Sequence, residues 1–274
     1  MSLPDNFQFN QNNLQDYADC NRRFQLRHLL RQEWPAIQSE PFLRTEQLIE
    51  LGQNFHRLVL QNQAGIPEDS ITNTIQDPEL SILWQNYKKN NPALHDFQTK
   101  AEFTLSIPFA SYRLTARYDL LVLHPESKFV IYDWKTSHIQ PKKDLMLNKM
   151  QSKVYPLVLS LAGYPPAEPI HPGNIEMIYW YPYHPFSPIS FSYSKEQQEK
   201  DQLNLENVIT EIKNLREPVF PLTADISKCR FCNYRSLCER GDKAGNLDEL
   251  EGIDGLPLDQ DWDLDFEKIE EISF

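Results

Sequence analysis

Two side chains that could act together in catalysis stand at the end of one apolar run, residues 129–136. The run is rich in β-branched and aromatic residues, which favours a buried β-strand. Side chains alternate between the faces of a strand, so Asp133 and Lys135 share one face and lie roughly 7 Å apart along it. A carboxylate and an ammonium are costly to bury without partners. We expect them to meet a bound ion and its water, and solvated charges on a surface strand are the alternative.

A second acid, Asp119, precedes this strand by the length of a hairpin. Residues 111–123 also have the pattern of a strand, and a short polar loop follows them. If Leu123 pairs with Phe129, Asp119 lies opposite Asp133, where Cβ atoms are about 4.5–5.5 Å apart and two negative charges repel. A divalent cation between the two carboxylates would remove that repulsion. A register shift by one residue would instead point Asp119 to the other face.

Two further polar side chains could reach this strand end. An amphipathic helix is expected over residues 45–60, with Gly52 allowing close approach to a sheet and His56 one turn later. A lone histidine on a helix is usually an ordinary packed or surface residue, so a metal-ligand role for His56 and a structural role both stay open. Residues 100–107 alternate like a first strand and carry Glu102, either as an exposed charge or as one more acid of the site.

A helix expected over residues 142–161 carries Gln151 and Tyr155 four residues apart on one face. The amide and the phenol could bind a phosphate or order Lys135. The alternative is a core position for Tyr155 and solvation of Gln151.

The first helix, expected over residues 10–31, carries an arginine stripe made of Arg23, Arg27 and Arg31. The stripe could contact phosphates, or it could be a solvated face. Hydrophobic periodicity predicts four more elements: helices over 76–91 and 194–215, and strands over 174–181 and 189–193.

The arrangement of acids and lysine resembles a known enzyme signature. Asp119, a hairpin and then Asp133-x-Lys135 are similar to the motif of the PD-(D/E)XK nuclease superfamily. The resemblance implies an α/β fold, in which a central mixed β-sheet is flanked by helices in a restriction-endonuclease-like core.

Two helical motifs resemble one branch of that superfamily, the RecB-type nuclease domain and the CRISPR-associated exonuclease with four cysteines. Gln151-Ser-Lys-Val-Tyr155 is similar to its Q-x-x-x-Y motif, and Gly52-Gln-Asn-Phe-His56 is similar to its G-x-x-x-H motif. The resemblance implies roles for the residues that match. Mg²⁺ or Mn²⁺ would be held by Asp119, Asp133, His56 and the carbonyl of Trp134; Lys135 would orient the attacking water; Gln151 and Tyr155 would position Lys135 or its strand.

The four cysteines form one pattern. Cys229, Cys232 and Cys238 are spaced as C-x2-C-x5-C, and Cys20 lies 209 residues before the first of them. Cytosolic disulfides are rare, so clustered thiols indicate metal or redox chemistry. Four thiolates suit a zinc ion or an iron–sulfur cluster, their spacing does not decide between these, and unrelated buried thiols are a further alternative. The resemblance implies a structural 4Fe-4S cluster in a helical subdomain made by both chain ends.

Composition sets further bounds on the 274-residue chain. Its hydrophobic content of 40% supports a real core, and we expect a nuclease domain over residues 1–247. Of the net charge of −12, residues 248–274 contribute −10 through eleven acids and one lysine, so the rest is near −2. That remainder can still hold a local basic groove, although charge gives no support for DNA binding. The acidic tail is expected to be flexible, or to dock on a partner or fold over a basic groove.

Other functions lose support from what the sequence lacks. The chain has no phosphate-cradling G-x-x-x-x-G-K-[ST] loop, so an ATPase is not expected. It has no signal pattern and no apolar run of transmembrane length, so a cytoplasmic protein without a membrane partner is expected.

The sequence therefore predicts a metal-dependent deoxyribonuclease with an iron–sulfur cluster. We expect an exonuclease that acts on single-stranded DNA or free ends, in DNA repair, recombination or CRISPR-type adaptation, with a helicase or a CRISPR adaptation protein as a partner. The alternative is a non-catalytic nucleic-acid-binding or assembly module on the same scaffold, with zinc in place of iron and sulfur.

Overall fold

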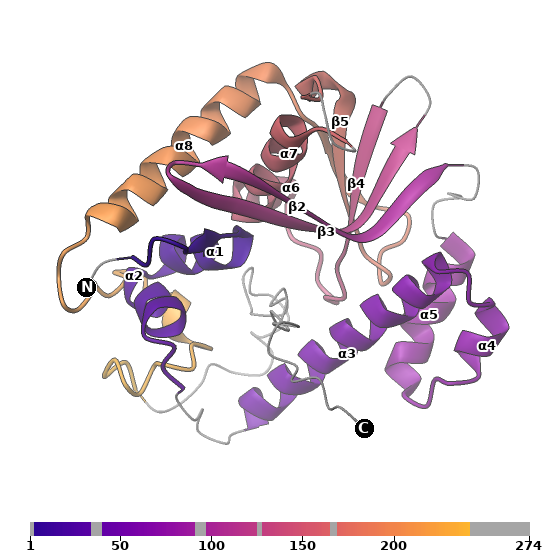
Figure 1. Ribbon diagram of the computed structural model, residues 1–274. Coiled ribbons are helices and arrows are strands. Elements are labelled where there is room, and N and C mark those ends of the chain that lie inside the picture. The colour runs from indigo at the N-terminus through magenta and orange to yellow at the C-terminus, as the bar shows by residue number, and fades with distance from the viewer. Residues whose placement is uncertain (1–2, 34–39, 91–96, 125–127, 165–168, 242–274) are drawn as a thin grey trace, which may run out of the picture.

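A computed structural model describes residues 3–33, 40–90, 97–124, 128–164 and 169–241, and the predicted acidic tail lies outside these ranges. A mixed β-sheet forms the centre, with strands in the order β1-β3-β4-β5-β6 and β2 paired with β3. The strand bounds are β1 Gln8–Phe9, β2 Gln98–Phe109, β3 Tyr112–His124, β4 Lys128–Trp134, β5 Ile175–Trp180 and β6 Ile189–Ser192. Helices lie on both faces of the sheet, which confirms the predicted mixed α/β class (Figure 1).

Strand β3 pairs with a single strand, β2, along one edge and with two strands, β1 and β4, along the other edge. It pairs antiparallel with β2 over nearly its whole length. On the other edge, β1 runs parallel to residues 113–114, and β4 pairs antiparallel from Leu120 onward. Residues 115–118, between these two neighbours, form ladder pairs with β2. Asp119 lies between residues 115–118 and Leu120, where the pairing with β4 begins. The strand order therefore brings Asp119 next to the end of β4.

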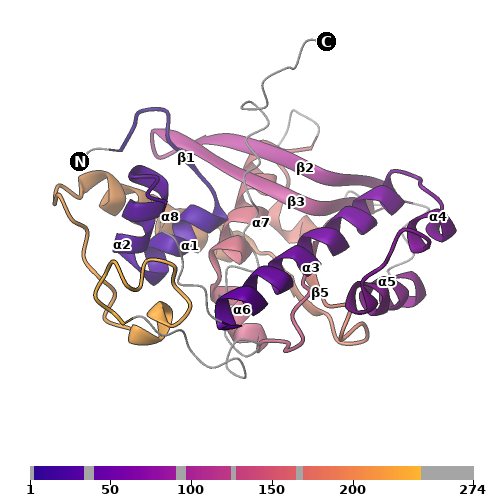
Figure 2. The ribbon, with the colours of Figure 1, turned by 90° about the horizontal axis from the view of Figure 1, so that it is seen from below.

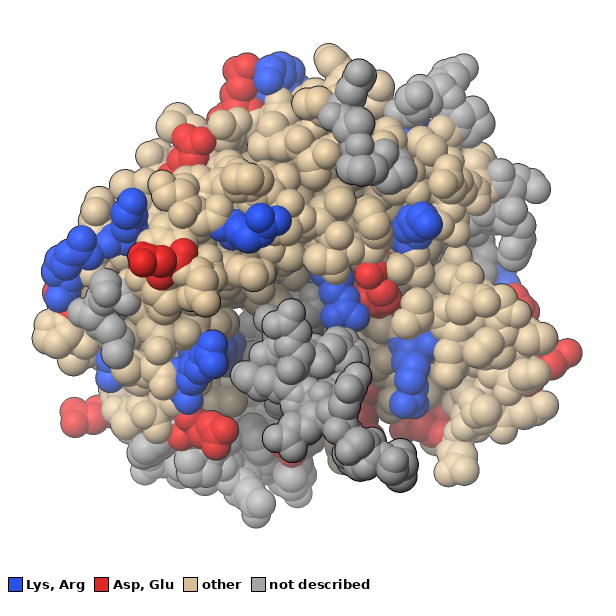
Figure 3. All heavy atoms as spheres, viewed as in Figure 1, with Lys and Arg blue, Asp and Glu red and all other residues tan. Residues whose placement is uncertain are grey.

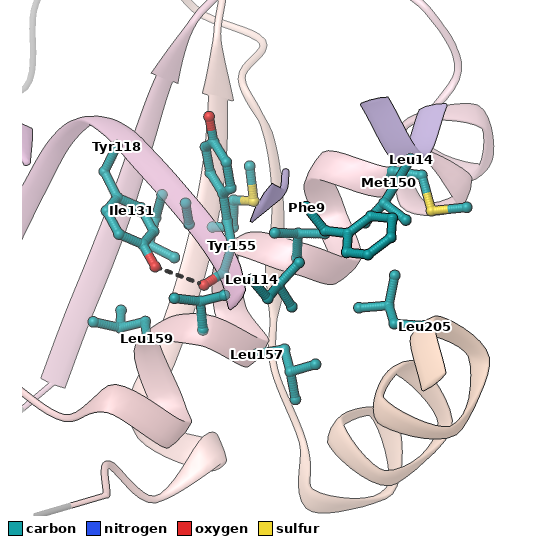
Figure 4. Packing of buried hydrophobic residues seen from close by; sticks show 14 of the residues in the cluster. Phe9, Leu14, Leu114, Tyr118, Ile131, Met150, Tyr155, Leu157, Leu159 and Leu205 are labelled. Carbon is teal, nitrogen blue, oxygen red and sulfur yellow. Dashed lines mark hydrogen bonds between the residues drawn. The ribbon is translucent and has the colours of Figure 1, made fainter. Parts of the chain in front are cut away.

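Helix α7 (Met150–Ala162) covers one face of the sheet, with α1 (Gln11–Asp19) and α8 (Lys195–Asn214) beside it (Figure 1). Figure 4 shows how Tyr155 of α7 packs toward Tyr118 and Ile131 of the sheet. The hydroxyl of Tyr118 donates to the backbone carbonyl of Tyr155 at 3.0 Å. Each apolar side chain buried in this core stabilises the fold by about 1.5–3 kcal/mol, which fixes α7 on the strands.

Helices α3 (Glu40–Gln63), α4 (Glu68–Thr72) and α5 (Pro78–Asn90) cover the opposite face, and Figure 2 shows α3 crossing the strands from below. Aromatic rings fill this second core. Trp84 stacks on Tyr87, and Trp134 and Trp180 meet the Tyr87 ring edge-on, at centroid distances of 5.5–6.0 Å. Among the described residues, none of the helices has the length and apolarity needed to cross a membrane.

The two ends of the described chain lie side by side, as the yellow segment next to α2 (Asn21–Phe24) shows in Figures 1 and 2. The buried amide of Gln25 joins them, because it donates to the carbonyl of Pro218 at 3.0 Å and accepts from the N–H of Phe220 at 2.9 Å. The hydroxyl of Tyr234 donates to the carbonyl of Gln32 at 3.0 Å. The union of chain ends expected from the cysteine pattern is therefore present as a packed contact.

Two predicted helices are interrupted. The helix expected over residues 10–31 breaks at Cys20, which is extended with φ −164°, and continues as α2 and a π-helix over Gln25–Leu29. The helix expected over residues 142–161 divides at Lys149, which has ψ 146°, into α6 (Lys143–Asn148) and α7. The backbone N–H of Met150 at the start of α7 donates to the side chain of Gln15 at 3.0 Å, so a long-range cap allows this break.

Candidate active site

The predicted hairpin register is confirmed, because Leu123 faces Phe129 across the β3–β4 ladder. Ile131 packs in the core under α7, and Trp134 packs in the core with α3 and α5. The expected alternation of faces along β4 is therefore present. Asp133 lies on the α7 face and is only 2% exposed, since β4 is an inner strand between β3 and β5.

Asp133, Lys135 and Gln151 form a closed set of contacts. Lys135 Nζ lies 2.9 Å from Asp133 Oδ2 and donates to Gln151 Oε1 at 3.1 Å, and Gln151 Nε2 donates to Asp133 Oδ1. The same Nζ is 5.6 Å from the centroid of the Tyr179 ring, within cation–π range. Lys135 is 8% exposed, so its charge is held in place by partners rather than by water. Of the interpretations offered for Gln151, this geometry fits the ordering of Lys135.

Asp119 approaches the end of β4 from the neighbouring strand. Its Oδ2 accepts from the backbone N–H of Trp134 at 2.8 Å and lies 3.5 Å from His56 Nδ1. Burial alone would raise the pKa of Asp119, but His56, the Trp134 N–H and Lys135 outweigh burial and lower that pKa below its usual value. The carboxylate is thus kept ionised, the state that binds a cation.

Glu102 and Asp119 occupy the point where β2 and β3 stop alternating regularly. Tyr118 and Leu120 are two residues apart on β3, yet they pack in opposite cores. On β2, the two neighbours of Glu102, Ala101 and Phe103, also pack in opposite cores. Glu102 has φ +50°, a left-handed conformation that is costly for a residue with a Cβ atom. Its carboxylate accepts from Arg117 Nε at 2.7 Å. Burial and the negative charge of Asp119 raise the pKa of Glu102.

His56 reaches the site from α3. Its Nε2 lies 3.0 Å from the carbonyl oxygen of Trp134, which can only accept, so Nε2 carries the proton. Nδ1 is left facing Asp119 Oδ2. If Nδ1 carries no proton, its lone pair points at a lone pair of Asp119 Oδ2. The two atoms therefore need a proton or a cation between them. A histidine nitrogen and a carboxylate oxygen arranged in this way suit a metal ion.

Gly52 brings α3 close enough for His56 to make these contacts. A Cβ atom at Gly52 would lie 3.0 Å from Thr136 Oγ1, tighter than ordinary packing allows. The predicted reason for this glycine, close approach of the helix to the sheet, agrees with the structure.

The residues His56, Glu102 and Asp119 offer ligand atoms that all lie within 4.8 Å of one another. Divalent cations bind such ligands at about 2.0–2.6 Å, so one ion fits between them. Two of the predicted ligands already have protein partners. Asp133 contacts Lys135 and Gln151, and the Trp134 carbonyl accepts from His56. The structure thus places Glu102, rather than Asp133, with His56 and Asp119.

Tyr155 lies within the core rather than at the strand end. It is 1% exposed, and its hydroxyl accepts from Gln11 Nε2 of α1 at 3.1 Å. Its backbone carbonyl holds Tyr118 of β3. Among the described contacts, its position matches the core alternative rather than a direct contact with Lys135, and it links α1 and α7 to Tyr118 of β3, one residue before Asp119.

The four cysteines converge from both chain ends. Cys20 and Cys229 are buried, and Cys232 and Cys238 are partly buried, each with a free thiol. Burial raises the pKa of the last three, and negative charge on neighbouring thiols raises it further, whereas Arg23 lowers the pKa of Cys232. These mutual effects place the thiols in one neighbourhood. In the described part of the chain, groups of three possible ligands within 4.8 Å do not include them.

At its first two positions the arginine stripe forms ion pairs with acids of α1 rather than a freely solvated face. Arg23 Nε lies 2.7 Å from Asp16, and Arg23 also contacts Asp19 at 2.7 Å. Arg27 lies 2.8 Å from Asp16, and His28 lies 2.9 Å from it. These ion pairs connect the helical segments to each other, and a phosphate contact by the stripe stays a prediction. On the face seen in Figure 3, basic and acidic side chains are interspersed among the described residues.

Some residues of the site escaped the sequence analysis. Glu102 was left open between an exposed charge and a site residue, and Tyr179 and Gln11 were assigned no role. Tyr179 lies on β5, which runs parallel to β4 with Asp133 opposite Tyr179, so the pairing of these strands was the signal that could have indicated it.

Comparison with known proteins agrees with this geometry. A family model described as the PD-(D/E)XK nuclease superfamily matches residues 8–239, a range that contains every residue of the site. A search of curated proteins finds no match. One solved structure, titled "Crystal structure of SSO0001", is 12% identical and covers 85% of this chain and 86% of its own, with a TM-score of 0.44.

Proposed function

Because the chain belongs to the PD-(D/E)XK nuclease superfamily, whose members are generally metal-dependent phosphodiesterases, we propose that it is a metal-dependent nuclease that hydrolyses DNA. One observation carries the proposal: His56, Glu102 and Asp119 converge within 4.8 Å, one strand away from a buried lysine.

His56, Glu102 and Asp119 would hold Mg²⁺ or Mn²⁺, with Asp133 and the Trp134 carbonyl as further ligands suggested by the sequence. The bound ion supplies positive charge that polarises the scissile phosphate and lowers the pKa of its water. Carboxylate ligands favour Mg²⁺, and the histidine makes Mn²⁺ competitive.

Lys135 would orient the attacking water and stabilise the negative charge that develops on the phosphate. Its Nζ is already fixed by Asp133 and Gln151, so little reorganisation is needed as the reaction proceeds. A charge fixed in this way in a low-dielectric site stabilises a transition state more than the same charge in water.

Degradation of labelled DNA with Mn²⁺ tests the proposal by comparing the unmodified protein with Lys135→Ala. Lys128→Ala is the matched control, since Lys128 is an exposed lysine of the same strand that pairs with Glu176. We expect the control to degrade DNA normally and Lys135→Ala to lose activity. Equal degradation by Lys135→Ala and the unmodified protein would refute the catalytic assignment.

We further propose that the enzyme is an exonuclease of the RecB-type branch, acting on single strands or free ends. Support comes from the motifs that contain His56 and Gln151, because both residues contact the strand end that carries Lys135. Duplex would be unwound by a partner, a helicase or a CRISPR adaptation protein. Linear single-stranded DNA should be degraded and circular single-stranded DNA should survive; cutting of the circle would contradict exonuclease action.

We also propose a 4Fe-4S cluster held by Cys20, Cys229, Cys232 and Cys238. Four sulfurs around one zinc ion, each at about 2.3 Å, lie roughly 3.8 Å apart. Support for the larger cluster comes from the one-plus-three arrangement of the cysteines, which resembles the four-cysteine branch of the superfamily. Anaerobically purified protein should absorb visible light and contain iron, and Cys232→Ser should lose both. A colourless protein that contains zinc would support the zinc alternative instead.

A further inference from the structure

Phe186 is 85% exposed, the most exposed large apolar side chain in the part of the chain that the structure describes. It lies in the segment that follows β5, residues 181–188. This segment begins beside the candidate active site, because the N–H of Lys135 donates to the carbonyl of Trp180 at 2.9 Å. An exposed ring on a segment that begins at the candidate active site calls for an explanation that a ring elsewhere on the surface would not.

The segment holds Phe186 outward on a rigid turn. The N–H of Ser187 donates to the carbonyl of His184 at 3.0 Å, and Pro185 occupies the second position of that turn, where proline is favoured. Proline also stands at positions 182 and 188. Little conformational entropy remains to be lost when a ligand meets the ring.

The turn is fastened to the loop that follows Lys135. The rings of His138 and Tyr183 stack at a centroid distance of 3.9 Å, and both side chains contact Glu79 of α5, at 2.7 and 2.9 Å. His184 Nε2 donates to the carbonyl of His138 at 2.6 Å, and Gln140 donates to the carbonyl of Ser187. The loop beyond the catalytic lysine and the turn that carries Phe186 are therefore one unit.

The two segments of this unit carry no negative charge of their own. Residues 134–143 and 181–188 contain no acid; the exposed Lys142 and Lys143 end the first segment, and the exposed Asp144 follows them. Glu79, contributed by α5, is occupied by His138 and Tyr183. Exposed aromatic rings combined with nearby lysines are the surface that binds single-stranded nucleic acid, with bases on the rings and phosphates on the cations.

We propose that Phe186 is a stacking platform for an unpaired base of the strand whose backbone enters the active site. The inference rests on the proposed nuclease function and specifies its substrate as a single strand. A base inside a duplex already has neighbours on both faces, whereas an unpaired base offers an open face to the ring. Stacking accounts for an aromatic side chain that is exposed on a hydrogen-bonded turn fastened to the loop that follows Lys135.

Binding of fluorescein-labelled oligothymidylate, measured by anisotropy, tests the platform. All proteins carry Lys135→Ala, so that the oligonucleotide stays intact. Phe186→Ala should raise Kd about tenfold, the loss expected for one stacked base, and Phe186→Trp should restore binding. An abasic oligonucleotide of the same length keeps the phosphates, so its Kd should not change with Phe186→Ala. Leu203→Ala, which removes a 60%-exposed side chain from α8, is the matched control and should bind normally.

Three outcomes would overturn the platform: no measurable binding of oligothymidylate, equal effects of Phe186→Ala on the normal and abasic strands, or full binding by Phe186→Leu, which would indicate a simple apolar contact such as one with a partner protein. Cleavage by protein with an intact Lys135 is measured in parallel. If the protein cleaves DNA and Phe186→Ala leaves the Kd unchanged, the platform alone is refuted. If binding depends on the base but no DNA is cleaved, the nuclease function alone is refuted.

Discussion

Asp119 accepts the backbone N–H of Trp134 at 2.8 Å, so a candidate metal ligand on β3 also fixes the backbone of β4 one residue before Lys135. The carbonyl of Trp134 accepts from His56 in turn. Both polar backbone groups of Trp134 are thus held by side chains of the site. These two bonds fix the position of Lys135 relative to His56 and Asp119.

Replacements of Asp119 should separate its two tasks. Asp119→Asn keeps an oxygen that can accept from Trp134 but loses the charge, and Asp119→Ala loses both. We expect both variants to lose Mn²⁺ binding and nuclease activity. Asp119→Ala should also lower the free energy of unfolding by about 1–3 kcal/mol, since a buried N–H is left without its acceptor. Urea unfolding measures the difference, and equal stability of the two variants would contradict it.

We expect Glu102 to contribute as much to the affinity for the metal ion as His56 does. Removal of either side chain, as His56→Ala or Glu102→Ala, should weaken Mn²⁺ binding about tenfold or more, as measured by calorimetry. His171→Ala is the control, because His171 accepts from the N–H of Gly173 in a turn before β5. If Glu102→Ala bound Mn²⁺ normally, Glu102 would be a partner of Arg117 alone.

Asp16 should make the fold sensitive to acid. Burial opposes its ionisation, but His28, Arg27 and Arg23 outweigh burial and lower its pKa from 3.8 to about 2. Because the folded pKa is depressed, the stabilisation is complete above about pH 4 and is lost as the pH falls toward 2; it amounts to about 2.5 kcal/mol. Asp16→Asn should be destabilised at pH 7 and lose this pH dependence in urea unfolding, whereas Asp5→Asn, at an exposed position, should behave normally.

The contact between α3 and the loop after Lys135 should appear in a double-mutant cycle. Gly52→Ala should destabilise the protein, because the new Cβ meets Thr136 Oγ1 at 3.0 Å. In a Thr136→Ala background that obstacle is gone, and Gly52→Ala should become neutral or stabilising by up to about 1 kcal/mol through helix propensity. Equal costs in both backgrounds would show that the strain lies elsewhere.

The local parts of the site followed from the sequence. Alternation along β4 and the length of the hairpin loop fixed the register of Leu123 with Phe129, because both depend on neighbouring residues. The spacing of Gly52 and His56 likewise indicated a close helix. The fold class followed from the resemblance to the nuclease superfamily.

The non-local parts did not. Glu102 joins the site through a left-handed backbone conformation that its residue type does not favour. The helix break at Lys149 depends on a cap supplied by Gln15, 135 residues away. Arg23 and Arg27 turn inward because Asp16 is buried beside them, a pairing that helical spacing alone could not distinguish from a solvated stripe.

The joining of the two chain ends has a consequence for synthesis. Gln25 finds its partner Phe220 195 residues later, an interval of about 10–40 s at the ribosome's usual pace of 5–20 residues per second. Until Phe220 is translated, the amide of Gln25 lacks this partner, and the N-terminal helices lack part of their packing. The nascent chain therefore completes the packing around Gln25 only after residue 220 has been translated.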